Sequence, residues 1–114
     1  MAITEIRENE LIYRSQDPSN SQHAAEAVFI YTTFCGTCQL AERMLNIVQA
    51  TGVRIPIYKL NINYAPQLRE AWKVTSVPCL ALLSNGAPIR LEYSMQSVDY
   101  LYNLINTYTP TTHN

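Results

Sequence analysis

Blocks of apolar and polar residues alternate along the chain of 114 residues and predict an alternation of strands and helices. Residues 28–31 are four consecutive apolar positions, rich in β-branched and aromatic types, and predict a strand that is buried on both faces. After residue 38 the apolar positions recur at helical spacing. The side of this helix that we predict to face the core consists of Leu40, Met44, Ile47 and Val48.

The remaining blocks continue the alternation. Further strands are predicted at 3–6, 53–60, 80–83 and 89–93, and further helices at 10–15, 66–73 and 98–108. A strand, a helix and a strand in succession form a right-handed crossover, so strands 28–31 and 57–60 should be parallel neighbours. In the helix at 66–73, we expect Leu68, Ala71 and Trp72 to pack against the core.

Residue types that favour turns and caps separate these elements. Asn9 is the predicted cap of helix 10–15, and Ser97 that of the last helix. Residues 16–22 have the composition of a turn, and Asn85-Gly86 predicts a hairpin because both residues tolerate a positive φ. Residues 110–114 are expected to be a frayed tail.

Cys35 and Cys38 lie where the central strand passes into the first turn of the following helix. Backbone N–H groups in a first turn lack helical acceptors and carry partial positive charge, so they stabilise a thiolate. Cys35 is therefore the predicted nucleophile. Cys38 follows at i+3 on the same helical face, within reach of a disulfide. Gly36 and Thr37 keep the loop between them short, and Gly36 lets a partner approach closely.

Two other interpretations of the cysteine pair are an inert pair of core thiols and half of a zinc site. A structural zinc site usually takes four ligands, often as two pairs of cysteines. Beyond Cys35 and Cys38 this chain offers Cys79, His23 and His113 as single residues. The strand-to-helix position therefore favours redox chemistry over metal binding, and no metal site is predicted.

Composition limits the function classes further. The net charge of -1 provides no basic surface for nucleic acid or membranes. Three cysteines, an odd count, fit a reducing compartment with one working pair and one spare. The first ten residues carry acids and no apolar segment, so we expect no secretory signal and a cytoplasmic protein. The length predicts one domain, spanning 1–114.

Four segments together carry a resemblance to a known family. They are Phe34-Cys35-Gly36-Thr37-Cys38, Lys59-Leu60-Asn61-Ile62, Val77-Pro78 and Leu82-Leu83-Ser84-Asn85-Gly86. In this order the chain resembles thioredoxins over nearly its whole length. The resemblance implies an α/β thioredoxin fold, with a central mixed sheet of four to five strands flanked by helices.

The resemblance also implies roles for individual residues. Cys35 attacks and Cys38 resolves, and the bond before Pro78 is cis. The backbone of Val77 pairs with an extended substrate segment, a mode of recognition that reads shape more than side chains. Phe34, Ile62 and Val77 then form the apolar contact patch.

These roles describe a thiol-disulfide oxidoreductase that reduces protein disulfides and needs no separate cofactor. The implied electron donor is a flavin-dependent reductase that uses NADPH, such as thioredoxin reductase. Ser76, Ser94 and Asn63 replace two glycines and an aspartate that are common in thioredoxins, which leaves the choice of partner open. Oxidation or isomerisation of disulfides is an alternative within the same chemistry, and a binding or metal-carrying module using Cys35, Cys38 and Cys79 is an alternative outside it.

Three further positions depart from the thioredoxin pattern. Phe29 stands where the family has a buried acid near the resolving cysteine, so Lys59 loses that partner. Lys59 then either favours the Cys38 thiolate or reaches water, and we expect the second. Thr37 replaces the proline of the motif, and we expect a somewhat less reducing couple than thioredoxin. Cys79 follows Pro78, close to the redox pair in the implied fold, and is expected to be a small buried residue.

Overall fold

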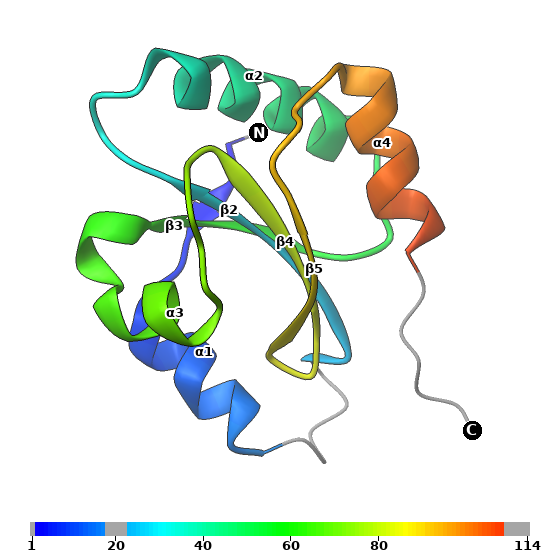
Figure 1. The fold of residues 1–114 in the computed structure, drawn as a ribbon. Helices are drawn as coiled ribbons and strands as arrows, with labels where there is room; N and C mark the ends of the chain where they lie inside the picture. The colour runs from blue at the N-terminus through cyan, green and yellow to red at the C-terminus, as the bar shows by residue number, and fades with distance from the viewer. Residues whose placement is uncertain (1, 18–22, 109–114) are drawn as a thin grey trace.

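Seven residues with mostly apolar side chains, Ala25–Tyr31, form the central strand β2 of a five-stranded sheet (Figure 1). The computed structural model describes residues 2–17 and 23–108. Its strands are β1 (Thr4–Glu5), β2 (Ala25–Tyr31), β3 (Ile57–Asn61), β4 (Cys79–Ser84) and β5 (Ala87–Glu92). Its longer helices are α1 (Glu8–Ser15), α2 (Gly36–Ala50), α3 (Pro66–Ala71) and α4 (Val98–Thr107).

The sheet is mixed, with the strand order β1-β3-β2-β4-β5. Strands β1, β3 and β2 are parallel, whereas β4 pairs antiparallel with β2, and β5 pairs antiparallel with β4. The parallel pairing of β2 and β3 through the helix α2 confirms the predicted crossover. The α/β class with a mixed sheet and flanking helices is confirmed as well.

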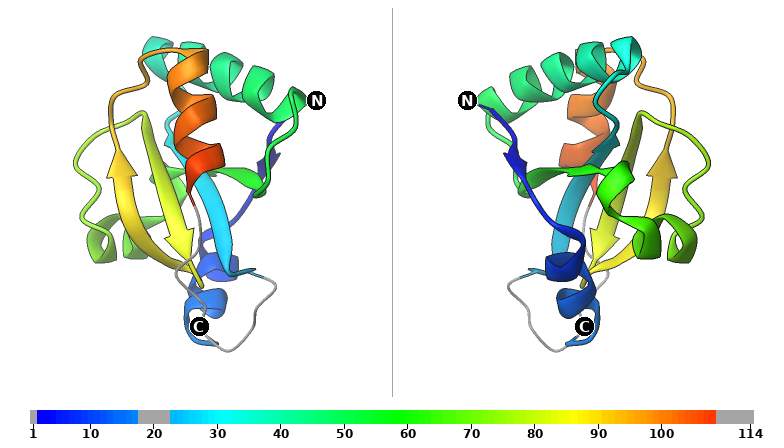
Figure 2. Two further views of the ribbon diagram at one scale, coloured as in Figure 1. Left: turned by 90° about the vertical axis from the view of Figure 1, so that its right-hand side faces the viewer. Right: turned by 90° about the vertical axis from the view of Figure 1, so that its left-hand side faces the viewer.

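Helices cover both faces of the sheet, α2 and α4 on one and α1 and α3 on the other (Figure 2). Alternate residues of β2 point to opposite faces, so Phe29 enters the cluster beneath α2 and α4, and Val28 and Ile30 enter the other. Trp72 packs into this second cluster, as predicted. Within residues 2–17 and 23–108, no helix has the length and apolar character needed to cross a membrane.

The core-facing side of α2 differs from the prediction. Leu40 and Ile47 are 48% and 51% exposed, and the buried residues of the helix are Cys38, Ala41, Leu45 and Val48. This set follows the spacing i, i+3, i+7, i+10 more regularly than the predicted one does. The prediction was wrong because it gave full weight to large apolar residues and ignored Cys38 and Ala41, which are buried.

Other predicted boundaries also move. Strand β3 begins at Ile57 rather than at residue 53, as expected from the missing N–H of Pro56. Asn9 lies inside α1 and does not cap it, because Arg7 precedes the helix and its N–H donates to Glu10 Oε1 at 2.9 Å. Ala71 ends α3 in an exposed position, so it was wrongly assigned to the core.

The predicted turn and cap chemistry is otherwise confirmed. Asn85 and Gly86 have φ values of 52° and 83° in the hairpin between β4 and β5. A Cβ at Gly86 would lie 2.7 Å from the backbone nitrogen of Ser15, so this position requires glycine on two grounds. Ser97 Oγ caps α4 by accepting from Tyr100 N at 3.0 Å. Most of the predicted turn at 16–22, and the predicted tail at 110–114, lie outside the described residues.

Strand β2 begins at Ala25, three residues before its predicted start, and the added residues include a buried carboxylate. Glu26 is fully buried, and its Oε2 accepts from Arg14 Nη1 of α1 at 2.7 Å and lies 3.3 Å from His23 Nδ1. Among residues 2–17 and 23–108, no hydrogen-bond partner meets its buried Oε1. The carboxylate therefore depends on the guanidinium of Arg14 for compensation.

Replacing Arg14 with Met leaves this buried carboxylate without its guanidinium, so we expect a loss of about 3 kcal/mol in the free energy of unfolding. Urea denaturation followed by circular dichroism measures it. The matched control is Arg90→Met, since Arg90 and Glu92 also pair at 2.7 Å but the Arg90 side chain is 50% exposed. That change should cost below about 1 kcal/mol. Equal midpoints for Arg14→Met and the wild type would contradict the expectation.

Candidate active site

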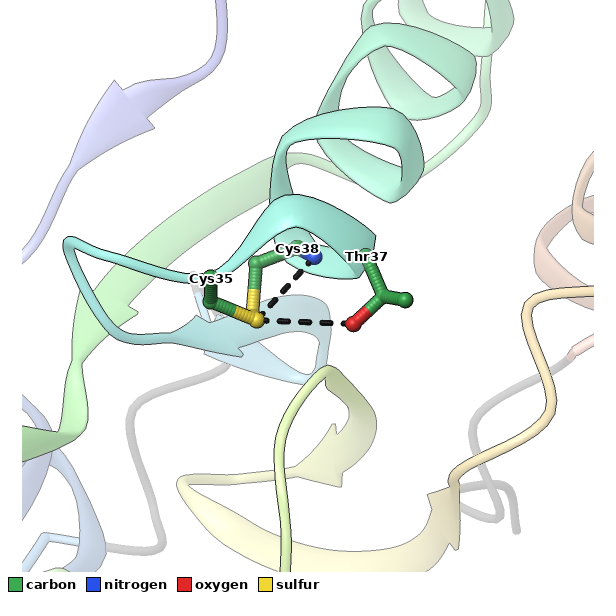
Figure 3. Close-up of a disulfide and its surroundings, with 3 residues drawn as sticks. All are labelled: Cys35, Thr37 and Cys38. Atoms are coloured by element: carbon green, nitrogen blue, oxygen red, sulfur yellow. Dashed lines mark hydrogen bonds between the residues drawn. A yellow bond between two sulfur atoms is a disulfide. The ribbon is translucent and has the colours of Figure 1, made fainter.

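Cys35 is the N-cap residue of α2, with an extended backbone at φ −144° and ψ 104°. Its carbonyl accepts the first helical hydrogen bond, from Gln39 N at 3.1 Å. Its Sγ accepts from the backbone N–H of Cys38 at 3.2 Å and lies 3.5 Å from Thr37 Oγ1 (Figure 3). A sulfur in this position accepts the hydrogen bond that the side-chain oxygen of an N-cap residue normally accepts. It also lies at the positive end of the helix dipole.

Cys35 and Cys38 are joined by a disulfide, with their Cα atoms 5.2 Å apart. The two sulfurs differ in their surroundings. Cys35 is partly exposed, whereas Cys38 is 2% exposed and packs in the cluster beneath α2. An incoming substrate can therefore reach Cys35, while Cys38 is accessible mainly to its neighbour. This geometry matches the order of attack that the sequence predicts.

Asn61, at the end of β3, braces the loop that carries Cys35. Its side-chain Nδ2 donates to Thr33 Oγ1 at 3.3 Å, and its Oδ1 accepts from Asn63 N at 3.0 Å. One amide thus connects the loop after β2 with the turn after β3. Because β2 and β3 are parallel neighbours, both segments leave the same edge of the sheet.

The predicted substrate-binding residues lie in contrasting surroundings. Phe34 is 98% exposed beside Cys35. A Cβ at Gly36 would meet no atom within 4 Å, so its surface is open. Val77 and Pro78 are partly buried, and the peptide bond between them is cis, as expected. Ile62 is 6% exposed in the cluster beneath α1 and α3, so it offers little surface to the predicted apolar contact patch.

A groove of about 310 Å³ begins beside the redox pair. The residues that line it are all uncharged: Thr37, Leu40, Ala41, Met44, Pro78, Tyr93 and Met95. Thr37 Oγ1 also lies 3.5 Å from the Cys35 sulfur, so one lining residue of the groove adjoins the reactive atom. Leu40 and Met44, which the apolar pattern assigned to the core, form part of its wall. Their i, i+4 spacing was visible in the sequence, but the surface that they face was not.

Lys59 pairs with a carboxylate, whereas the sequence predicted that it reaches water. Its Nζ lies 2.8 Å from Glu42 Oε2 on α2 and 5.5 Å from the centre of the Tyr31 ring. The side chains of Lys59 and Glu42 are 23% and 25% exposed. Lys59 pairs in register with Phe29, the position that lacks the expected acid. An acid on the neighbouring helix thus supplies the partner of Lys59.

Tyr31, the last residue of β2, adds a neutral polar group to this region. Burial and the hydrogen bond that its hydroxyl donates to Glu5 Oε2 at 2.8 Å raise the pKa of Tyr31 well above its usual value. The phenol therefore stays protonated at neutral pH. Charge in this region comes from Glu5, Lys59 and Glu42.

Cys79 is fully buried and free, as expected of a small core residue. Its side chain belongs to the cluster beneath α1 and α3, on the opposite face of the sheet from Cys38. Burial raises the pKa of the Cys79 thiol to about 12. In the described part of the chain, no three His, Cys, Asp or Glu side chains form a group that could hold a metal ion, and His113 lies outside it.

The chain is similar to known proteins over most of its length. A model of the thioredoxin family matches residues 17–107. The chain is 38% identical over 103 residues to the thioredoxin-like protein YusE of Bacillus subtilis, covering 90% of this chain and 91% of YusE. It is 29% identical over 97 residues to a thioredoxin of Chlamydia caviae, covering 83% and 95% of the two chains.

Solved structures show the same fold at lower sequence identity. A mutant thioredoxin from Halobacterium salinarum aligns with a TM-score of 0.73 at 24% identity, covering 98% of this chain and 93% of that one. The oxidised thioredoxin from Plasmodium falciparum aligns with a TM-score of 0.74 at 18% identity, covering 94% and 98%. These alignments confirm the fold that the sequence implied.

Proposed function

The chain belongs to the thioredoxin family, and from that premise we propose that it reduces protein disulfides with Cys35 as the nucleophile and Cys38 as the resolving thiol. The protein is a thiol-disulfide oxidoreductase. The observation that most directly supports the two roles is the N–H of Cys38, which lies 3.2 Å from the Cys35 sulfur at the start of α2. The backbone N–H that contacts the Cys35 sulfur in the disulfide can stabilise the Cys35 thiolate after reduction.

The reaction takes place in two exchange steps. The Cys35 thiolate attacks one sulfur of a substrate disulfide, and the other substrate sulfur leaves as a thiolate that takes up a proton. Cys38, once deprotonated, then attacks Cys35 Sγ and releases the first substrate sulfur. The substrate gains two electrons, and the protein is left with the Cys35–Cys38 disulfide that the structure contains.

A further cycle requires an outside reductant for that disulfide. We propose a reductase of the kind that serves thioredoxins, which passes electrons from NADPH through a flavin. The reductive direction also fits a cytoplasmic location, where free cysteines such as Cys79 persist. Thr37 inside the motif should make the couple somewhat less reducing than that of thioredoxin.

The surface around Cys35 suits an extended protein segment better than a small molecule. We propose that the backbone of Val77 pairs with the substrate segment, while Phe34 and the uncharged groove beside Thr37 and Pro78 receive its apolar side chains. Phe34 is 98% exposed, so folding gains little from its ring. An aromatic side chain in that position contributes contact area to a partner.

Replacing Cys38 with Ser should trap substrate proteins on Cys35, because the mixed disulfide forms but cannot be resolved. Non-reducing gel electrophoresis with mass spectrometry detects the adducts. Replacing Cys35 with Ser is the matched control and should trap almost none. If Cys35→Ser accumulates adducts equally well, the two roles are assigned the wrong way round. Release of zinc or iron from the purified protein, with no reduction of insulin, would favour a binding module instead.

Replacing Phe34 with Ser should raise KM for a protein disulfide about tenfold, which corresponds to about 1.5 kcal/mol of lost apolar contact. The rate with a small aromatic disulfide should stay the same, because that substrate needs only the cysteines. Tyr13→Ser serves as the control, since Tyr13 on α1 is 70% exposed and lies outside the site. An unchanged KM for the protein substrate would exclude Phe34 from the contact surface.

A further inference from the structure

The second exchange step requires a proton acceptor near Cys38. Only the thiolate form of a cysteine attacks a disulfide, so the Cys38 thiol must lose its proton while the substrate is still bound to Cys35. Cys38 is 2% exposed, and burial disfavours the charged form of a thiol. Bulk water has little access to this proton, so a neighbouring side chain has to take it.

The elements around Cys38 carry few ionisable side chains. On α2 itself, Glu42 follows Cys38 by four residues, and side chains at this spacing stand on the same side of a helix with Cβ atoms about 5–6 Å apart. The strands beneath contribute Lys59 and Tyr31, and β1 contributes Glu5, whose carboxylate accepts from the Tyr31 hydroxyl. The helix α4 contributes the phenols of Tyr100 and Tyr108, which stay protonated because the pKa of each is raised. The register neighbour of Lys59 in β2 is Phe29, which has no acid or base to offer.

Glu42 is the one member of this group suited to accept a proton from Cys38. Lys59 is a cation, Tyr31 stays protonated because its pKa is raised, and Glu5 is hydrogen-bonded to Tyr31 on the outer strand. The Glu42 carboxylate is held by Lys59 Nζ at 2.8 Å and its side chain is 25% exposed, so protein covers most of it while it still reaches water. A proton accepted there can pass on to solvent.

We propose that Glu42 is the general base for Cys38 and that Lys59 positions its carboxylate, an inference that rests on the proposed function. The Cys38 proton passes to Glu42, directly or through one water molecule. The Cys38 sulfur forms its bond to Cys35 Sγ as the bond from Cys35 to the substrate sulfur breaks. The departing substrate sulfur keeps that electron pair and takes up a proton from water.

The test is the rate of the second step in Glu42→Gln, an isosteric change at a partly exposed helical position. Reduced protein is mixed with a peptide disulfide, and quenched samples give the mixed disulfide against time from pH 6 to 9. Wild-type resolution should depend weakly on pH. In Glu42→Gln the rate at pH 7 should fall about 100-fold and recover as pH rises, because hydroxide then deprotonates Cys38.

Two controls separate this inference from the proposed function and from a change of net charge. Glu70→Gln removes one exposed negative charge on α3 and should leave the resolution rate unchanged. The first step, measured in Cys38→Ser with and without Glu42→Gln, should proceed at equal rates. If Cys38→Ser forms no mixed disulfide, the proposed function fails. If mixed disulfides form and Glu42→Gln resolves them at the wild-type rate at pH 7, Glu42 is not the base.

Discussion

The structure depends on a sulfur held against the unpaired amides that begin a helix. Cys35 takes the N-cap position of α2, and its sulfur accepts from the backbone N–H of Cys38. The first turn, residues 36–39, contains no acidic side chain to weaken the positive end of the helix dipole. This arrangement favours the thiolate of the outer cysteine, which makes the pair a redox couple as well as a structural crosslink.

The sheet brings the other parts of the site to this point. Parallel pairing of β2 and β3 places the loop of Cys35 beside Asn61, which braces it, and beside Lys59, whose ammonium holds Glu42. Antiparallel pairing of β4 with β2 brings the start of β4 to the same edge, with Pro78 immediately before it. Strands β2, β3 and β4 thus all meet at the site, and the N-terminal part of α2, with its cap Cys35, carries both sulfurs and the acid proposed to serve the inner one.

The sequence predicted correctly those features that depend on residues close together in the chain. The strand-to-helix position of the cysteines and the positive φ at Asn85-Gly86 follow from residue types at short range. Long-range pairing decided the rest. Glu26 is buried because Arg14 reaches it from another element, and the apolar residue Leu40 is exposed because it faces a groove instead of the sheet. The Glu42–Lys59 pair likewise joins residues 17 positions apart, which no pattern in the sequence connects.

Titration of the Cys35 thiol tests most directly whether the helix amides stabilise its thiolate. The ultraviolet absorbance of the thiolate is measured against pH in reduced Cys38→Ser protein. Cys79 stays silent in the relevant range, since burial raises its pKa to about 12. We expect a pKa for Cys35 well below the free value of about 8.5, returning toward that value in denaturant. A folded-state pKa at or above about 8.5 would contradict it, because the helix amides would then not stabilise the nucleophile.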